Sequence, residues 1–135
     1  MTRLLADTSA YSALLRGHPI IADLLRTADE IFVTPVVLGE LRAGFRRGDR
    51  QAQNEKRLES FLASPRVRIA DVDAATSMYY ATIFDSLRAS GTSIGTNDVW
   101  IAASAMQHGL RLVTTDGDFR RIVQLIVDWV PLHPP

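Results

Sequence analysis

The chain has 135 residues, of which 47% are hydrophobic, which suffices for one domain with a substantial core. Its 15 basic and 15 acidic residues give a formal net charge of zero, so the overall charge indicates neither a nucleic-acid nor a membrane partner. The absence of cysteine excludes disulfides, thiolate metal sites and a cysteine nucleophile. There is no signal-peptide pattern and no apolar run of transmembrane length, so we expect a cytoplasmic protein without a membrane segment.

The first predicted element is a short strand over residues 4–6, whose apolar side chains suit the buried centre of a parallel sheet. The strand ends at Asp7, and a helix is predicted over residues 9–15. Thr8 or Ser9 is the expected N-cap of this helix, and Asp7 is an alternative cap. In an open parallel sheet, ligands bind beyond the carboxyl ends of the strands, so the position of Asp7 is also that of a binding site.

Strands and helices alternate along the rest of the chain. Further strands are predicted over residues 30–34, 67–70, 110–114 and 126–130. Further helices are predicted to begin at Pro19, at Pro35, after a cap at Asp73, and at a cap formed by Thr96 or Asn97. This alternation implies right-handed crossovers and an α/β fold, with a parallel sheet of four to five strands and helices on both faces. We expect a single domain over residues 1–135.

Four carboxylates fall at comparable points of this pattern. Asp7 and Asp116 each follow an apolar strand, Asp98 lies in the first turn of a helix, and Glu40 lies on the helix after the second strand. Individually, each has an ordinary explanation as a helix cap, a surface residue or a turn residue. Together at one sheet edge they would repel one another, and a bound cation would remove that cost. Oxygen ligands alone favour Mg²⁺ or Mn²⁺ over Zn²⁺.

Four stretches taken in order resemble a PIN domain, and most of all the VapC ribonuclease toxins of bacterial VapBC modules. These stretches are Asp7-Thr8-Ser9, the helical Glu40, the run from Asn97 through Asp98 to Ala103, and the run from Thr114 through Asp116 to Phe119. The resemblance implies a metal-dependent endoribonuclease in which Asp7, Glu40, Asp98 and Asp116 are the catalytic and metal-binding residues. It assigns accessory roles to Thr8, Thr114 and Asp118, and Asp118 also fits the fourth acidic position.

The implied reaction is cleavage of an RNA phosphodiester, in tRNA or rRNA, by water that a Mg²⁺ ion activates, with Mn²⁺ as a substitute. The implied partners are a VapB-like antitoxin, whose tail covers the acidic site, and a second copy of the chain in a homodimer. Two alternatives remain open from the residues. One is phosphoryl transfer through an aspartyl intermediate on Asp7, although Ser9 stands where that chemistry usually has a second aspartate. The other is a catalytically silent module that binds RNA or protein.

Local positive charge offers a candidate RNA-binding surface. Arg42 and Arg46 are four residues apart on the helix that carries Glu40, so they project from one helix face. Further basic residues follow at Arg47, Arg50, Lys56 and Arg57. A solvated helix surface and a contact to the RNA backbone explain this stretch about equally well, and we retain Arg42 and Arg46 as the candidate RNA contacts.

Overall fold

A five-stranded parallel sheet forms the centre of the computed structural model, which describes residues 1–133. The strand order is β3-β2-β1-β4-β5, and each neighbouring pair is parallel. The strands are β1 (Arg3–Ala6), β2 (Glu30–Val33), β3 (Val67–Ile69), β4 (Arg111–Thr114) and β5 (Val127–Trp129). The predicted α/β class and parallel sheet are therefore confirmed, and residues 134–135 of the expected domain lie outside the described residues.

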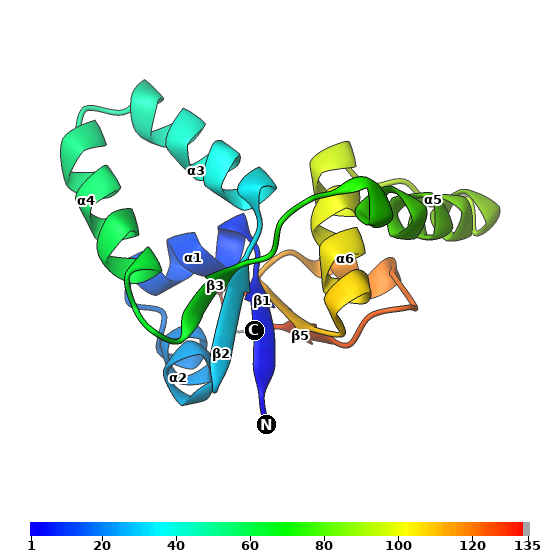
Figure 1. Ribbon diagram of the computed structural model, residues 1–135, viewed down its shortest axis with the longest axis horizontal. Coiled ribbons are helices and arrows are strands. Elements are labelled where there is room, and N and C mark those ends of the chain that lie inside the picture. The colour runs from blue at the N-terminus through cyan, green and yellow to red at the C-terminus, as the bar shows by residue number, and fades with distance from the viewer. Residues whose placement is uncertain (134–135) are drawn as a thin grey trace.

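The helices cover the two faces of the sheet in the order that right-handed crossovers require. The described helices are α1 (Thr8–Leu15), α2 (Pro19–Thr27), α3 (Pro35–Arg47), α4 (Gln51–Leu62), α5 (Ala74–Ala89), α6 (Thr96–His108) and the short 3₁₀ helix η1 (Gly117–Arg121). The chain runs from β1 outward to β3, which places α1 to α4 together on one face. It then returns to β4 through α5 and α6, which pack against each other on the other face (Figure 1).

Local sequence signals explain most of the helix boundaries. Pro19 and Pro35 stand in the first turns of α2 and α3, where the missing N–H costs nothing. Asp73 caps α5 in a reciprocal capping box with Thr76, as predicted for this cap. Gly109 ends α6 with φ +63°, a left-handed conformation that favours glycine.

Of the predicted N-caps, the alternative cap Asp7 of α1 is confirmed, whereas Thr8 or Ser9 for α1 and Thr96 or Asn97 for α6 are wrong. Helix α1 begins at Thr8 and its cap is Asp7, whose carboxylate accepts a hydrogen bond from the Ala10 amide, so neither Thr8 nor Ser9 takes that place. Helix α6 begins at Thr96 after a Gly95 cap that makes no side-chain hydrogen bond, so Thr96 and Asn97 both lie inside the helix. In α1, the hydroxyl groups of Thr8 and Ser9 are therefore available for other contacts near the carboxyl edge of the sheet.

The chain order places a topological switch point at the carboxyl ends of β1 and β4. Strands β1, β2 and β3 are added in one direction, and β4 is then added on the other side of β1, so the connections diverge between β1 and β4. Ligands of doubly wound sheets bind at such a switch point. Both strands are rigidly held there, because Leu5, Ala6, Leu112 and Val113 are fully buried in the core.

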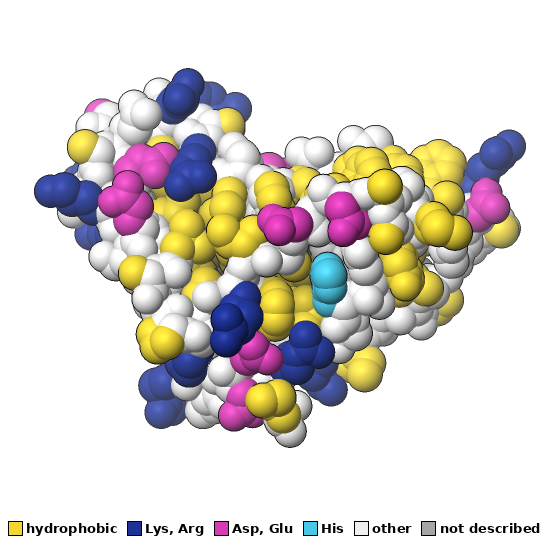
Figure 2. Space-filling model, in the orientation of Figure 1, with side chains coloured by type: hydrophobic (Ala, Val, Ile, Leu, Met, Phe, Trp, Pro, Cys, Tyr) yellow, Lys and Arg dark blue, Asp and Glu magenta, His cyan; other side chains and the backbone are white. Residues whose placement is uncertain are grey.

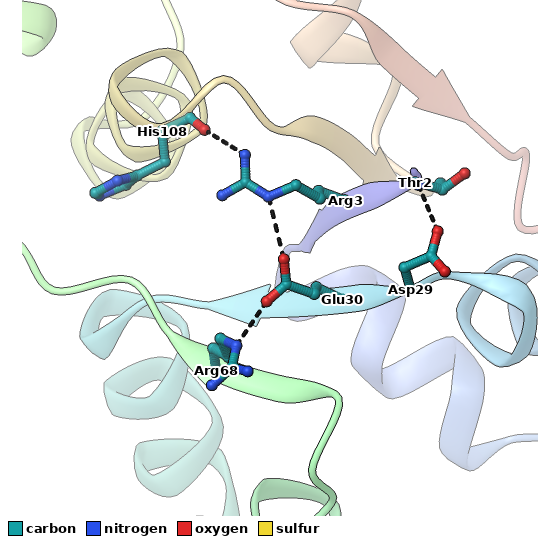
Figure 3. A network of polar contacts seen from close by, with 6 residues as sticks. All are labelled: Thr2, Arg3, Asp29, Glu30, Arg68 and His108. Carbon is teal, nitrogen blue, oxygen red and sulfur yellow. Dashed lines mark hydrogen bonds and ion pairs between the residues drawn. The ribbon is translucent and has the colours of Figure 1, made fainter.

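Ion pairs tie the strands together near their amino ends, away from the switch point. Glu30 on β2 accepts from Arg3 Nε on β1 at 3.3 Å and from Arg68 Nε on β3 at 2.6 Å (Figure 3). Arg3 also donates to the carbonyl of His108 at the end of α6. These pairs are partly exposed, so each contributes little stability. Within residues 1–133, no helix is long and apolar enough to cross a membrane.

Candidate active site

Asp7 is the buried centre of the site, with 3% of its surface exposed. One carboxylate oxygen accepts from the Ala10 amide at 2.8 Å and from the Ser9 hydroxyl at 2.7 Å, and the other accepts from the Thr114 hydroxyl at 2.6 Å. Burial raises the pKa of Asp7, the hydrogen bonds lower it, and the charge of Asp116 raises it further. Asp7 therefore both caps α1 and presents a fixed carboxylate at the end of β1.

The loop after β4 carries Asp116 and is fastened to Asp7 through two hydroxyl groups. The Asp116 amide donates to the Thr114 hydroxyl at 2.9 Å, and that hydroxyl donates in turn to Asp7. The Thr115 amide donates to the Ser9 hydroxyl at 3.0 Å. Sequence reasoning did not assign Ser9 to the site, although its place two residues after Asp7, in the first turn of a helix, was the available signal.

Glu40 reaches the site from α3 through Thr8. The Thr8 hydroxyl donates to Glu40 Oε1 at 2.7 Å, and Thr8 directly follows Asp7 in the chain. Glu40 is half-buried, as its position beside the apolar face of α3 predicts. The hydrogen bond fixes one carboxylate oxygen of Glu40 on the same edge of the sheet as Asp7.

Asp98 lies in the first turn of α6, where the helix dipole favours a negative charge. Its pKa is nevertheless raised to about 6, first by burial and then by repulsion from Asp116, Glu40, Asp7 and Asp118. Asp98 is therefore repelled by all the other acidic side chains of the site. The structure brings all four sequence-predicted carboxylates into one electrostatically coupled group.

Asp116 acts more strongly than Asp118 on the pKa values of the other carboxylates. Asp116 raises the pKa of both Asp7 and Asp98, whereas Asp118 is the weakest of the charges that act on Asp98. Asp118 is exposed and lies 3.7 Å from Arg121 in an ion pair, and its amide donates to Asp116. The contacts favour Asp116 as the fourth acidic residue and leave Asp118 at the rim.

The residues fit a hard divalent cation in chemistry and in charge. Every candidate donor is an oxygen, and burial, followed by repulsion from neighbouring carboxylates, raises the pKa values of Asp7 and Asp98, so a cation would favour their charged forms. In the part of the chain that the structure describes, no group of three or more His, Asp or Glu side chains is already arranged to hold a metal ion. The carboxylates would therefore have to draw together around an ion.

Helices α3 and α4 form an arm beside the site that ends in basic residues. Figure 2 shows Lys and Arg side chains gathered around the end of this arm. Arg46, Arg47, Arg50, Lys56 and Arg57 are exposed along it. Arg42 instead forms an ion pair with Glu55 of α4 at 3.3 Å, which offsets part of its charge. Of the two predicted RNA contacts, Arg46 is thus the more available.

Known proteins with this fold and these motifs are similar over nearly the whole chain. The PIN domain family model matches residues 4–125. The ribonuclease VapC2 of Rickettsia felis is 34% identical over 127 residues, which cover 90% of this chain and 93% of that protein. The ribonuclease VapC4 of Mycobacterium tuberculosis is 34% identical over 118 residues, which cover 87% and 88%.

A solved structure agrees with this assignment. VapBC2 from Rickettsia felis, bound to a DNA fragment from its promoter, superposes with a TM-score of 0.84 at 29% identity, covering 94% of this chain and 98% of that chain. The family model spans most of the chain, and the two relatives exceed 30% identity over most of their length. The chain therefore belongs to the PIN-domain family and, within it, to the VapC ribonucleases.

Proposed function

We propose that this chain is a Mg²⁺-dependent endoribonuclease that acts as the toxin of a type II toxin–antitoxin module. The observation that carries the proposal is the gathering of carboxylates at one edge of the sheet, where hydrogen bonds through Thr8 and Thr114 hold Glu40, Asp7 and the Asp116 loop. The pKa of Asp98, raised to about 6 by burial and by four neighbouring carboxylates, agrees with this arrangement. A protein gains nothing in stability from gathering these charges, so the arrangement favours a role in binding a cation. Membership of the VapC ribonucleases supplies the reaction class.

Asp7, Asp98, Glu40 and Asp116 are the ligands and catalytic residues in this proposal. Asp7 and Asp98 are the firmest ligands, because short side chains at a strand end and a helix start hold their geometry best. Asp116 completes the set, and Asp118 assists at the rim. Thr114 and Ser9 hold Asp7 and the Asp116 loop in register through their hydroxyl groups. Mg²⁺ is the preferred ion for such oxygen donors, and Mn²⁺ is a substitute.

The reaction needs no side-chain nucleophile. When bound, Mg²⁺ supplies the positive charge that makes water acidic and offsets the charge of the phosphodiester. Glu40 has the longest side chain of the four and is oriented by Thr8 through one oxygen. We therefore assign to the other oxygen of Glu40 the acceptance of the proton that the attacking water loses.

The proposed substrate is structured cellular RNA, either tRNA or rRNA. An acidic site repels the RNA backbone, so cations must flank it, and the exposed Arg46 on the α3–α4 arm is the best-placed candidate. The proposed protein partner is a VapB-like antitoxin, since solved relatives are VapBC complexes. An arginine from the antitoxin would suit the acidic site, because a guanidinium binds carboxylates through paired hydrogen bonds. A homodimer is a further prediction, to be checked by light scattering.

The test in vitro is cleavage of total RNA by the purified protein, with mapping of the cut ends. Activity should disappear in EDTA and return with Mg²⁺ or Mn²⁺. Asp7→Asn should abolish cleavage while α1 stays capped, because asparagine is also a good N-cap. Asp85→Asn, an exposed position on α5, is the matched control and should cleave as the wild type does. Full activity in EDTA would exclude the metal mechanism.

The test in cells is growth after expression without an antitoxin. The wild-type chain should arrest growth, and the Asp7→Asn variant should not. Co-expression of the antitoxin encoded beside it should restore growth in the wild type. Equal toxicity of the wild type and Asp7→Asn would show that growth arrest does not arise from RNA cleavage, and would count against the toxin assignment.

A further inference from the structure

Trp129 ends the edge strand β5 and contacts the loop that carries Asp116. Strands β4 and β5 pair with Thr114 opposite Trp129, so the indole lies next to the point where the loop leaves the sheet. The indole Nε1–H donates to the carbonyl of Thr115 at 3.3 Å. Trp129 is 36% exposed, which is unusual for so large an apolar side chain that serves only to fill a core.

Arg120 of η1 stacks on Trp129 and adds a second contact to the loop. Its guanidinium carbon lies 3.8 Å from the centre of the Trp129 ring, within the range of a cation–π interaction. Its Nε–H donates to the carbonyl of Gly117 at 3.4 Å. A Cβ on Gly117 would stand 3.3 Å from the Arg120 guanidinium and 3.6 Å from the Trp129 ring, so glycine lets the loop lie flat against this pair.

The carbonyls of Thr115 and Gly117, which accept hydrogen bonds from Trp129 and Arg120, belong to the residues on either side of Asp116. On the inner side, the same loop is fastened by the Thr115 amide to Ser9 and by the Asp116 amide to Thr114. The loop is thus held from both sides, and the position of the Asp116 carboxylate follows from these contacts. Without the outer contacts, a short loop at a sheet edge would be free to carry Asp116 away from the other acidic side chains.

We propose that Trp129 and Arg120 are positioning residues that clamp the Thr115–Gly117 loop and so set Asp116 in the site. Neither residue touches the substrate in this role. The proposal deepens the proposed function and rests on it for the metal, but the clamp itself is a property of the folded chain that can be measured without metal or RNA.

The clamp is tested first by amide hydrogen exchange in EDTA. Exchange at the Asp116 and Asp118 amides reports on the loop, because both amides donate hydrogen bonds within it. Trp129→Ala should speed exchange at both amides by at least about tenfold through local opening. Val127→Ala removes apolar area from the same strand at a position paired with Leu112, two residues before the end of β4, and should leave both amides unchanged. Equal exchange in the two variants would overturn the clamp.

The consequence for the site is tested by Mn²⁺ titration without RNA, well below the unfolding temperature. Trp129→Ala should weaken Mn²⁺ binding by about tenfold, the usual effect of removing a group that orients a ligand. Trp129→Phe keeps the ring but loses the Nε1–H donor, so its loss should be smaller. Unchanged affinity in Trp129→Ala, or an equal loss in Val127→Ala, would overturn the positioning role.

Substitution of Arg120 distinguishes two roles for this residue, namely positioning of the loop and attraction of RNA. Arg120→Lys keeps the charge but loses the flat guanidinium that stacks on Trp129. Positioning predicts that Arg120→Lys lowers kcat and Mn²⁺ affinity with little change in KM. Attraction of RNA predicts full rescue by lysine, and this result would overturn the role of Arg120. A wild-type chain that binds no Mn²⁺ and cuts no RNA would refute the proposed function, while the exchange experiment would still decide the clamp.

Discussion

Replacement of Asp98 by asparagine separates the cost of the acidic cluster from its function. In the absence of metal, the ionised Asp98 destabilises the folded chain, because burial and repulsion raise its pKa from 3.8 to about 6. Asparagine has nearly the same shape and carries no charge. Asp98→Asn should therefore be more stable than the wild type in EDTA at pH 7, although it should not cleave RNA.

The size of the gain follows from the pKa of Asp98. A rise from 3.8 to about 6 corresponds to an upper limit of about 3 kcal/mol. Asp98 is only half-buried, so solvent screening reduces this to about 1 to 2 kcal/mol. Asparagine also forgoes the favourable interaction of a carboxylate with the α6 dipole, worth up to about 1 kcal/mol. We expect a net gain near 1 kcal/mol, or about 3 to 5 °C in Tm.

The stability difference between the wild type and Asp98→Asn should depend on pH, and the raised pKa fixes its direction. Below pH 3.8, Asp98 is protonated in both the folded and unfolded states, so the wild type and Asp98→Asn should have equal stability. As the pH rises from about 4 to about 6, the unfolded state releases the proton more readily, and the wild type loses stability relative to the variant. Above pH 6 the difference should be constant. Urea unfolding of both proteins in EDTA across this range measures it.

Bound Mg²⁺ should make the wild type more stable than Asp98→Asn, the reverse of the order in EDTA. A hundredfold excess of Mg²⁺ over its Kd should stabilise the wild type by about 2.7 kcal/mol and Asp98→Asn by less. Asp85→Asn, exposed on α5, is the control and should follow the wild type at every pH. A loss of 1 kcal/mol or more in Asp98→Asn, with the same pH profile as the wild type, would refute this reasoning and show that Asp98 is a structural residue of the helix start.

Three further predictions test other contacts. In an Asp98→Asn background, Arg46→Ala should lower the log–log salt slope of RNA binding by about 0.7. Arg42→Ala should lower the slope by less, since Arg42 is paired with Glu55. Equal slopes in all proteins would refute the proposed RNA contact of this helix. Thr8→Val should lower kcat by freeing Glu40, and Thr8→Ser should restore it; failure of serine to do so would exclude the hydroxyl contact. Asp73→Ala should lower the free energy of unfolding with kcat unchanged, because α5 loses its cap. An unchanged urea midpoint would contradict the α5 capping box.

The sequence by itself determined the family and most of the elements, although α4 was not predicted. Apolar runs of strand length, prolines at helix starts and the Asp73 cap are local signals, and they predicted the α/β alternation that the structure contains. The order of four acidic motifs was enough to indicate the PIN-domain family. For α1 the alternative cap Asp7 was confirmed and Thr8 or Ser9 was wrong, because several polar residues stand side by side there and only one can take the capping geometry. The predicted caps of α6 at Thr96 or Asn97 were wrong, since Gly95 takes that place.

Only the tertiary structure decided how the site is held together. The contacts of Thr114 with Asp7 and of Thr115 with Ser9 join residues more than 100 positions apart, and they depend on β4 lying beside β1 in one register. The pairing of Arg42 with Glu55 requires α3 and α4 to lie against each other. The Trp129 contact with Thr115 likewise requires the pairing of β5 with β4. Local periodicity carries no information about register between distant strands, so these partners became visible only in the folded chain.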